Sequence, residues 1–265
     1  MKIATLNVNS INARLEGLCA WLQQNRPDVL LLQEIKCEFN NFPFFDIQMC
    51  GYDAKVLGQK SYNGVAVLSK HKLTVRHENL PNFDDENSRY LECEFKIGTE
   101  DYIVASLYLP NGNPPYNNPD DNSKFAYKLQ WMDAFIEHIS TLSAMHRNII
   151  LGGDFNVIMS DFDVYNPQEF IGNALFRPEV RKRLRYITRS GWCDTFRNLY
   201  PDEHGYTFWD YTGGAFINDL GMRIDYILSS PHLTDRLLSC RVDKELRQKE
   251  KSSDHTVLIA EFKDI

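Results

Sequence analysis

The sequence predicts an α/β protein in which two mixed β-sheets pack face to face and helices cover their outer faces. Three observations support this fold class. Predicted strands alternate with predicted helices and outnumber them, and both halves of the chain follow one order of strands, a helix, then strands. No linker, low-complexity tract or internal repeat divides the chain. We expect a single domain over residues 1–265, although other α/β layerings are compatible with the same pattern.

The first half begins with a strand, a helix and a second strand. The runs KIATLNV (2–8) and DVLLLQE (28–34) are typical of buried strands, and the second ends in polar groups. Between them, residues 13–25 carry apolar side chains at helical spacing, and Pro27 follows shortly after the helix. Four more strands are predicted, with turn-forming residues between them, at 62–70, 73–80, 90–97 and 102–109.

The second half begins with a loop rich in proline and asparagine, residues 110–122, that leads into a helix over 124–142. The apolar run that ends in GGD predicts a strand over 148–154. A further helix is expected from Pro178 to Ser190. The last predicted strands span 222–229, 237–243 and 256–262.

Composition limits the class of protein. The chain has 265 residues, 43% of them hydrophobic and 12% aromatic, which is enough to bury a large core. It contains no apolar run near the ~20 residues that a membrane span needs, and its amino terminus lacks the hydrophobic stretch of a signal peptide. We therefore expect a cytoplasmic protein with no membrane partner. The six cysteines are scattered without a CxxC pair, which argues against a disulfide framework and against a zinc site.

The net charge of −7 is not that of a typical nucleic-acid-binding protein, but the charge is unevenly distributed. Residues 177–197 hold seven basic side chains against two acids. A local basic surface of this kind can bind phosphates while acids elsewhere set the total charge. The other explanation is a solvated helix face, and the sequence leaves both open.

The stretch NIILGGDFNV raises the question of why a buried strand ends with an acid and an amide that point the same way. In an extended chain Asp154 and Asn156 share one face, roughly 7 Å apart, and the glycines before them permit a sharp bend or the close approach of a ligand. An ordinary turn is the competing explanation.

Similar residues follow or precede other strands. Asn7 ends the first strand, Glu34 ends the second, Asp225 lies between apolar neighbours, and Asp254 and His255 precede the last strand. Each has an ordinary structural explanation when it is considered alone. Asp225 is the hardest to explain in that way, because a buried carboxylate needs a partner and His255 is a suitable one.

The chemistry of this set is specific. Carboxylates and amide oxygens without cysteine suit Mg²⁺ or Mn²⁺ rather than zinc. A histidine held by a carboxylate gains basicity. A metal, an acid, an amide and an imidazole at one edge of a sheet sandwich together indicate hydrolysis of phosphodiesters.

The motifs also resemble a known family. The chain carries, in this order, LNVNS, LLLQEIK, YLPNG, GGDFNV, MRIDYIL and SDH. This set resembles the endonuclease/exonuclease/phosphatase superfamily, and GDFN and SDH are shared with phosphoinositide phosphatases and sphingomyelinases. The stretches GQKSYNGVAVLSK, QEIK and YTFWDY make the chain similar to the bacterial exonuclease III family of class II abasic-site (AP) endonucleases. The resemblance extends from residue 2 to about residue 262.

The resemblance implies a four-layer α/β-sandwich with the active site at one edge of its sheets. It implies a metal-dependent DNA repair nuclease of base excision repair that uses Mg²⁺, with Mn²⁺ as an alternative. Such an enzyme hydrolyses the phosphodiester 5′ to abasic sites in duplex DNA and trims 3′ ends as a 3′–5′ exonuclease and 3′-phosphatase. We expect a monomer, because DNA must reach an open edge.

The resemblance also implies a role for individual residues. Glu34 matches the principal metal carboxylate, with Asn7 and Asp254 close to the ion. Asp154 matches the residue that orients or deprotonates the attacking water, and Asn156 the one that stabilises the pentacoordinate phosphorus. His255, held by Asp225, matches the donor to the scissile phosphate. Tyr108 matches a tyrosine at that phosphate or the leaving group. In the predicted site Asp154 and Asn156 also belong to the surroundings of the metal.

DNA contacts and a sugar pocket are implied in the same way. The backbone contacts fall on Lys36, Ser61, Tyr62, Arg89, Asn111, Asn173 and Arg177, with the loop of residues 12–14 beside them. Such contacts bind phosphates without reading sequence. The pocket for a flipped-out abasic sugar is lined by Phe208, Trp209, Met222 and Ile224, for which core packing is the alternative.

Two segments depart from the family pattern. Some members carry a DNA-inserting arginine after YLPNG, where this chain has NPPYNNPDDNSKF. The region EFIGNALFRPEV varies where the balance between abasic cleavage and 3′-end trimming is thought to be set. Two alternatives remain open: a phosphatase or phosphodiesterase of the same superfamily acting on a lipid or inositol headgroup, and a non-catalytic nucleic-acid-binding protein.

Overall fold

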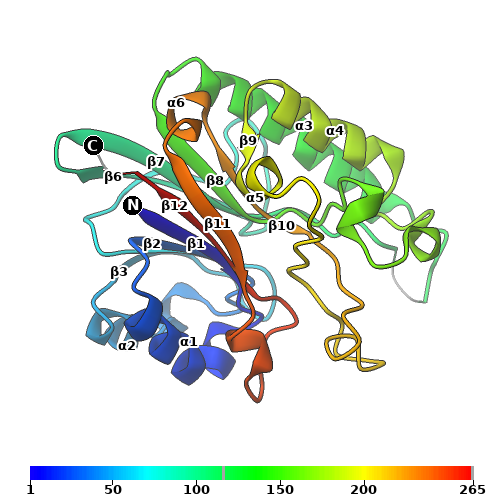
Figure 1. The fold of residues 1–265 in the computed structure, drawn as a ribbon, viewed down its shortest axis with the longest axis horizontal. Coiled ribbons are helices and arrows are strands. Elements are labelled where there is room, and N and C mark those ends of the chain that lie inside the picture. The colour runs from blue at the N-terminus through cyan, green and yellow to red at the C-terminus, as the bar shows by residue number, and fades with distance from the viewer. Residues whose placement is uncertain (115–116, 264–265) are drawn as a thin grey trace.

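A computed structural model of the chain describes residues 1–114 and 117–263; the proline- and asparagine-rich loop after β7 includes residues 115–116, which lie outside them. Strands form two six-stranded sheets, as Figure 1 shows. The first sheet has the order β11-β12-β1-β2-β4-β3 and the second β5-β6-β7-β8-β10-β9. The strands are β1 Lys2–Asn7, β2 Val29–Gln33, β3 Asp53–Leu57, β4 Val65–Ser69, β5 Thr74–Glu78, β6 Tyr90–Ile97, β7 Glu100–Tyr108, β8 Asn148–Asp154, β9 Cys193–Asp194, β10 Asp225–Ser229, β11 Leu237–Asp243 and β12 Val257–Phe262.

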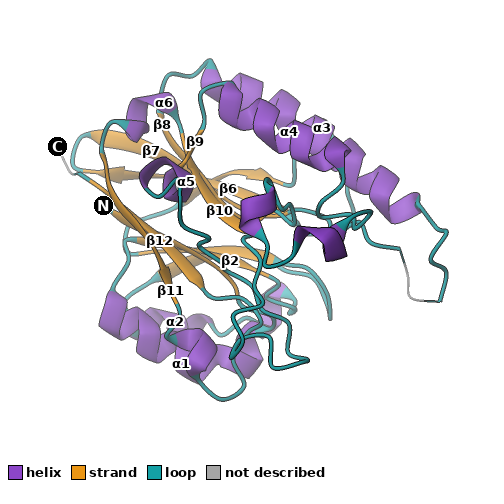
Figure 2. Ribbon diagram, turned by 45° about the vertical axis from the view of Figure 1, so that its right-hand side comes forward, coloured by secondary structure: helices purple, strands orange, loops and turns teal. Residues whose placement is uncertain are grey.

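Helices cover the outer faces of both sheets. The helices are α1 Ile11–Asn25, α2 Phe44–Met49, α3 Ser123–Ser143, α4 Pro178–Arg189, α5 Thr195–Leu199 and α6 Pro231–Thr234, with 3₁₀ turns at Phe39–Asn41, Asp161–Asp163, Pro167–Phe170 and Leu246–Gln248. Figure 2 shows α1 and α2 on one side of the paired sheets and α3 and α4 on the other. Within the described ranges, no helix combines the length and the apolar character that a bilayer crossing requires.

Three apolar clusters fill the spaces between these four layers. One cluster lies between the sheets and joins residues such as Leu31 and Val67 of the first sheet to Val104 and Ile150 of the second. The second cluster packs α1 and α2 against the first sheet. The third packs α3 and α4 against the other sheet, with Trp131 among its members. The structure therefore confirms the predicted four-layer α/β-sandwich.

Strand direction explains why one edge of the sandwich carries so many polar side chains. β1 is parallel to β2 and antiparallel to β12, and β8 is parallel to β7 and antiparallel to β10. The carboxyl ends of β1 and β2 therefore lie at the same edge as the start of β12. In the second sheet, the carboxyl ends of β7 and β8 lie beside the start of β10. Loops that leave or enter these six strands can bring their side chains together there.

Some elements could not be predicted. β3 is an edge strand with two charged residues in five, so its sequence lacks a continuous apolar run. α2, α5 and α6 have six residues or fewer, too short for a helical period to be recognised. The strand predicted from residue 222 begins at Asp225. Met222 instead forms isolated bridges with Val164 and Phe208, which brings the YTFWDY segment to the strand.

Candidate active site

Eleven of the residues predicted for the site line one cavity of about 620 Å³ at the edge where the strand ends meet. They are Glu34, Tyr108, Asn111, Asp154, Asn156, Asn173, Phe208, Met222, Ile224, Asp254 and His255. They come from segments spread over most of the chain and from both sheets. The fold thus brings together the polar strand ends that the sequence indicates.

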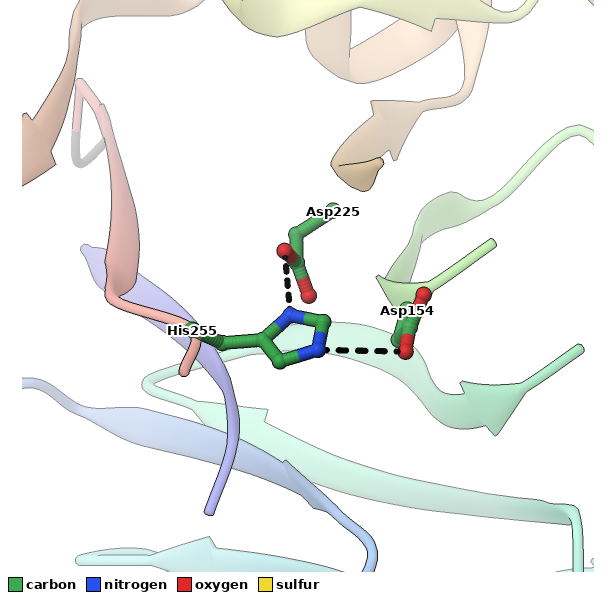
Figure 3. A group of neighbouring side chains, drawn as sticks. All are labelled: Asp154, Asp225 and His255. Atoms are coloured by element: carbon green, nitrogen blue, oxygen red, sulfur yellow. Dashed lines mark hydrogen bonds and ion pairs between the residues drawn. The ribbon is translucent and has the colours of Figure 1, made fainter. Parts of the chain in front are cut away.

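His255 lines this cavity. It lies between the carboxylates of Asp225 and Asp154, as Figure 3 shows. Its Nδ1–H donates to Oδ2 of Asp225 at 2.8 Å, and its Nε2 lies 3.6 Å from Oδ2 of Asp154. Burial opposes the charged imidazolium. Asp225 and then Asp154 favour it more strongly, and the pKa of His255 rises to about 10. The geometry therefore gives an imidazolium whose Nε2–H faces the cavity side.

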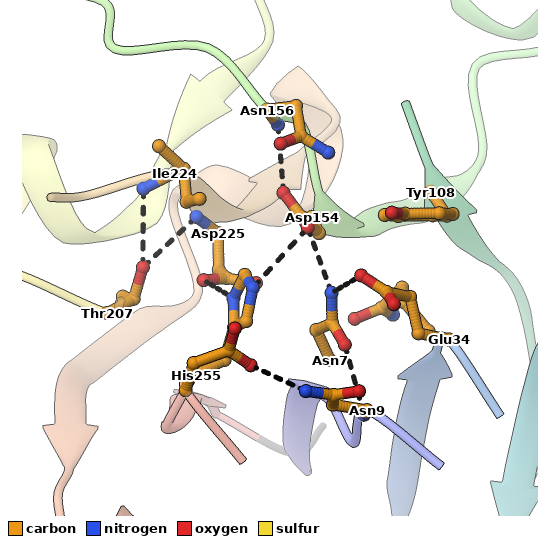
Figure 4. A network of polar contacts seen from close by, with 12 residues as sticks. Asn7, Asn9, Glu34, Tyr108, Asp154, Asn156, Thr207, Ile224, Asp225 and His255 are labelled. Atoms are coloured by element: carbon orange, nitrogen blue, oxygen red, sulfur yellow. Dashed lines mark hydrogen bonds and ion pairs between the residues drawn. The ribbon is translucent and has the colours of Figure 1, made fainter. Parts of the chain in front are cut away.

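Thr207 holds the backbone of the strand that carries Asp225. Its hydroxyl oxygen accepts the N–H of Ile224 at 3.3 Å and that of Asp225 at 3.1 Å, as Figure 4 shows. Asp225 enters the site at the first residue of β10, directly opposite Asp154 at the end of β8. The two acids that flank His255 are thus fixed by one antiparallel pair of strands.

Asp154 and Asn156 both line the cavity, but not through the spacing of an extended strand. β8 ends at Asp154, and Asn156 has a left-handed backbone with φ of 48°. The chain turns, and the N–H of Asn156 donates to Oδ1 of Asp154 at 2.9 Å. The Asn156 amide donates to the carbonyl of Leu109 at 2.9 Å. From the sequence, an ordinary turn and a common site for Asp154 and Asn156 were alternative explanations. In the structure both occur together.

Gly153 lies against the backbone of the neighbouring strand. A Cβ at this position would lie 1.9 Å from the carbonyl oxygen of Leu107 on the neighbouring strand β7. The absence of a side chain at Gly153 lets β7 and β8 come close enough for Asp154 to lie beside Tyr108.

Asn7 joins two acids of the site (Figure 4). Its side-chain NH₂ donates to Oε1 of Glu34 at 2.8 Å and to Oδ2 of Asp154 at 3.0 Å, while its Oδ1 accepts the N–H of Asn9 at 3.1 Å. In this arrangement Asn7 presents donors to the carboxylates, whereas the predicted metal role would use its oxygen. Asn9 extends the network, because its amide donates to Oδ1 of Asp254 at 3.1 Å.

Glu34 is held in its ionised form. Burial raises its pKa, but hydrogen bonds from Asn7 and Lys36 outweigh burial, so the net pKa is below the ordinary value. The Lys36 ammonium lies 2.8 Å from Oε2 of Glu34 and also donates to Asn9 at 2.7 Å. Glu34, Lys36 and Asn9 all have positive φ, a conformation that costs energy for residues with a side chain and often occurs at functional sites.

The donor set fits a hard divalent cation. Oxygens of Glu34, Asp154 and Asp254 line the same cavity, and thiol ligands are absent from its lining. Ligand atoms of Asp154, Asp225 and His255 lie within 4.8 Å of one another, but the imidazole already links those two acids through its own nitrogens. Burial, and the nearby charges of Asp225 and Glu34, raise the pKa of Asp154, which a cation would relieve. Among the described residues Glu34, Asp154 and Asp254 do not form so close a group, so a cation here would take one or two of these carboxylates and complete its shell with water or phosphate oxygens.

Tyr108 ends β7 and faces the same cavity. Burial and then the charges of Glu34 and Asp154 raise its pKa well above the ordinary value, so the phenol keeps its proton. Arg89 lies with its guanidinium carbon 4.9 Å from the Tyr108 ring centroid and donates to the Tyr108 carbonyl at 3.2 Å. Arg89, predicted to contact DNA, thus also supports Tyr108.

The predicted sugar pocket is only partly reproduced. Phe208, Met222 and Ile224 line the cavity and form its apolar wall, and the Phe208 ring stands edge-on to His255 with 4.9 Å between centroids. Trp209 does not line it. The indole is fully buried, packs against Tyr206 and Phe216, and donates to Asp219 at 3.1 Å. For Trp209 the structure therefore supports the core-packing alternative, because the next residue along an extended segment faces the opposite side.

The predicted DNA contacts are spread around the cavity. Asn111 and Asn173 line it directly. Lys36 and Ser61 line a neighbouring hollow, and Tyr62, 71% exposed, lies next to Ser61 in sequence. In the loop of residues 12–14, Arg14 is tied to the carbonyls of Asn9 and Lys251.

The basic segment of residues 177–197 is largely engaged within the protein. Arg177 donates to Glu179 at 2.7 Å and lies 3.8 Å from the Phe125 ring centroid, away from the cavity lining. Arg181 and Arg183 form ion pairs with acids of other segments. A free basic patch is therefore much smaller than the charge count of this segment suggests.

Sequence reasoning missed several residues that support the site. Asn9 and Thr207 bind the predicted residues directly, but nothing in the sequence distinguishes them from ordinary turn or strand positions. Arg223 is fully buried and donates to Asp163 and Asp194, each at 2.7 Å, which fixes the segment between Met222 and Ile224. A charged residue between two pocket residues was a signal that could have identified it.

Comparisons with known proteins agree with this geometry. Residues 4–255 match the Endonuclease/Exonuclease/phosphatase family. Exodeoxyribonuclease III of Haemophilus influenzae is 30% identical over 275 residues, covering 99% of this chain and 100% of that protein. An AP endonuclease from Archaeoglobus fulgidus superposes with a TM-score of 0.90 at 34% identity, and the 3′ phosphatase NExo from Neisseria, solved with a product DNA hairpin, with 0.92 at 36%. Both comparisons cover 100% of each chain.

The fold, the order of the site residues and these full-length matches lead to one conclusion. This chain belongs to the endonuclease/exonuclease/phosphatase family, and within it to the group of metal-dependent hydrolases that contains exonuclease III and the AP endonucleases.

Proposed function

We propose that this protein is a Mg²⁺-dependent DNA repair nuclease that cleaves the phosphodiester 5′ to abasic sites and also processes 3′ ends of duplex DNA. The observation that carries the proposal is the position of His255. Its imidazolium lies between Asp225 and Asp154, in the same cavity as Glu34 and beside the apolar wall of Phe208 and Met222. Charge for a phosphate and an apolar surface for a sugar thus meet in one cavity.

Asp154 prepares the nucleophile in this proposal. Asn7 and the Asn156 N–H orient its oxygens, so that the carboxylate can accept a proton from a water beside it. A water bound beside it loses a proton to the carboxylate as its oxygen attacks phosphorus. The bond to the leaving 3′ oxygen then breaks.

His255 and Asn156 meet the charge that builds on the phosphoryl oxygens. His255 donates from Nε2, while Asp225 holds the other side of the ring and fixes its orientation. The Asn156 amide uses one N–H on the Leu109 carbonyl, which leaves a second N–H for the phosphate. Tyr108, which keeps its phenolic proton, donates to the phosphate or the leaving oxygen. Carboxylates among Glu34, Asp254 and Asp154 would hold a divalent cation, which would supply neutralisation of the phosphate charge.

An abasic nucleotide fits the apolar wall because it presents a sugar without a base. Phe208, Met222 and Ile224 pack against a sugar that rotates out of the duplex, and a normal nucleotide would have to bring its base through the same space. Contacts from Lys36, Ser61, Tyr62, Asn111 and Asn173 bind the backbone and give salt-dependent affinity without sequence preference.

Processing of 3′ ends uses the same catalytic groups. A phosphate or nucleotide at a 3′ end needs attack on phosphorus but no flipped-out sugar. Two of the proteins compared above are an exodeoxyribonuclease III and a 3′ phosphatase. We therefore propose abasic incision and 3′-end processing as activities of one site, in a monomer with a single domain.

The test is cleavage of a duplex that carries one synthetic abasic site, with Mg²⁺ and with EDTA. The proposal predicts metal-dependent incision 5′ to the site that leaves a 3′-hydroxyl. Removal of 3′-phosphates or nucleotides without incision would retain the catalytic groups and reject the abasic pocket. Inactivity on both DNAs, together with hydrolysis of inositol or lipid phosphates, would reject the nuclease.

A further inference from the structure

A lysine is buried directly behind the site. Lys128 lies on α3, and its side chain has no exposed surface. Its ammonium donates to three backbone carbonyls: those of Asn111 at 2.9 Å, Asn156 at 2.6 Å and Ala174 at 3.2 Å. In the part of the chain that the structure describes, no carboxylate oxygen forms an ion pair with it. The three carbonyls therefore account for all of its donor capacity.

The three carbonyls belong to three different loops that carry amides to the cavity. Asn111 follows β7, Asn156 follows β8, and Ala174 adjoins Asn173 in the segment before α4. Side chains couple the same loops on the cavity side, because the Asn111 amide donates to Asn156 at 3.3 Å. A single ammonium thus ties together the backbones of the three segments that carry Asn111, Asn156 and Asn173 to the cavity.

The surrounding chain is shaped to admit this side chain. Gly112 has a φ of 83°, and a Cβ there would lie 2.6 Å from Cδ of Lys128. Lys128 also occupies the apolar stripe of α3, in line with Phe125, Met132 and Phe135. A leucine or methionine would suit that stripe better in hydrophobic terms, since an ammonium loses its hydration there. Burial lowers the pKa of Lys128 to about 7, with the charge of Asp154 acting in the opposite direction.

We propose that Lys128 is a positioning residue for phosphodiester hydrolysis: its ammonium clamps the three loops so that Asn111, Asn156 and Asn173 hold a fixed geometry around the phosphate. The proposal rests on the proposed function. A residue that acts through Asn156 changes the rate of the chemical step more than it changes substrate affinity, because a displacement of ~1 Å at a reacting group can cost ~10²-fold in rate.

The test compares Lys128→Met, which keeps the stem and removes the ammonium, with Lys124→Met, an exposed lysine one turn earlier on the same helix. Both are assayed on the abasic duplex for kcat and KM, and thermal unfolding is followed separately. We expect Lys128→Met to lower kcat about 10- to 100-fold with KM within about threefold of the wild type. Lys124→Met should match the wild type in both.

A double-mutant cycle with Asn156→Ala separates positioning from general packing. If Lys128 acts through Asn156, Lys128→Met costs less than about threefold once Asn156 is already absent. An equal loss in both backgrounds would overturn the proposal, as would a folded Lys128→Met with an unchanged kcat.

Folding and function are distinguished by two further results. If Lys128→Met does not fold, Lys128→Gln, which retains two N–H donors, is judged by the same criteria, and failure of both to fold would assign Lys128 to stability alone. If the wild type itself does not cleave DNA, the proposed function has failed. If the wild type cleaves and Lys128→Met cleaves equally well, only the positioning role has failed.

Discussion

Asp154 ends β8 of one sheet and His255 precedes β12 of the other, and Nε2 of His255 lies 3.6 Å from Oδ2 of Asp154 in the cavity. The distance is longer than a hydrogen bond, and it leaves the imidazole attached to Asp225 alone at its other nitrogen. The two groups are therefore close enough for each to influence the pKa of the other. They do not satisfy each other, so the imidazole can bind a phosphoryl oxygen and the carboxylate can bind a water.

Removal of either group should abolish efficient turnover without unfolding the protein. A preorganised donor at developing charge is typically worth about 3–4 kcal/mol, and general acid–base help about 10²–10⁴-fold. We expect His255→Ala and Asp154→Ala each to lose at least ~10³-fold in kcat on the abasic duplex. Circular dichroism and thermal unfolding serve as controls. A correctly folded variant with near-normal turnover would remove that residue from the mechanism.

The pKa of His255 should be far above that of a free imidazole. Its pKa is raised to about 10 because Asp225 and Asp154 outweigh burial, so the imidazolium persists through neutral pH. Since the folded pKa exceeds the unfolded one, this stabilisation is complete below about pH 6.5 and is lost as pH rises through about 10. NMR of ¹⁵N-labelled imidazole in metal-free protein measures the midpoint. Asp225→Asn should lower it by at least ~1 unit, and an unshifted midpoint would contradict the assigned contact.

Glu92 should control the stability of the protein in acid. It is fully buried on β6, where hydrogen bonds from His138, Tyr90 and Arg76 outweigh the effect of burial and lower its pKa to about 2. A depressed carboxyl pKa stabilises the fold above the unfolded value of about 4.5, and this stabilisation of about 3 kcal/mol is lost as pH falls towards 2. Glu92→Gln should be less stable at pH 7 by a similar amount and should lose little more in acid. Denaturant unfolding at several pH values tests this, with the partly exposed Glu94→Gln as control.

Metal should stabilise the folded protein as well as support its activity. A ligand that binds only the native state at about 100 times its Kd contributes about 2.7 kcal/mol. Mg²⁺ should therefore raise the unfolding temperature by several degrees, and EDTA should reverse this and stop turnover. Glu34→Gln should lose most of the Mg²⁺-induced shift, whereas Glu137→Gln, exposed on α3, should retain it. An undiminished shift in Glu34→Gln would exclude Glu34 as a ligand.

A substitution of Met222 should affect abasic incision more than the removal of 3′-phosphates. Its side chain contributes to the apolar wall, and a hydrophobic contact with substrate is worth ~10- to 200-fold in specificity. We expect Met222→Ala to lower kcat/KM for abasic incision at least ~10-fold and for 3′-phosphate removal less than ~3-fold. An equal loss on both substrates would show that the wall acts through the catalytic groups rather than on the sugar.

Much of the fold followed from the sequence, because long apolar strands and the helix α3 have clear periods. Elements of six residues or fewer, such as α2, contain too few repeats to show a period. The charged edge strand β3 was missed for a different reason. It pairs on one side only, so it needs no continuous apolar run.

The site was predictable where chemistry-bearing residues follow strand ends, as with Glu34 and Asp154, and where family motifs mark them. Trp209 shows the limit of motif matching, since an aromatic side chain beside a pocket residue points the other way in an extended segment. Lys128 occupies the position of an apolar residue on an amphipathic helix, and this departure is visible in the sequence. Only the structure reveals the three carbonyls that it binds.

The pairing of β1 with β12 makes the site depend on contacts between the two ends of the fold. Lys2 lies opposite Glu261, so the centre of the first sheet joins residues that are synthesised at opposite times. Asp254 and His255 immediately precede β12, so they reach the cavity only when this strand has paired with β1. A partly folded chain in which β1, β2 and β8 have formed would contain Asn7, Glu34 and Asp154 in place but would lack the imidazole, and we expect it to be inactive.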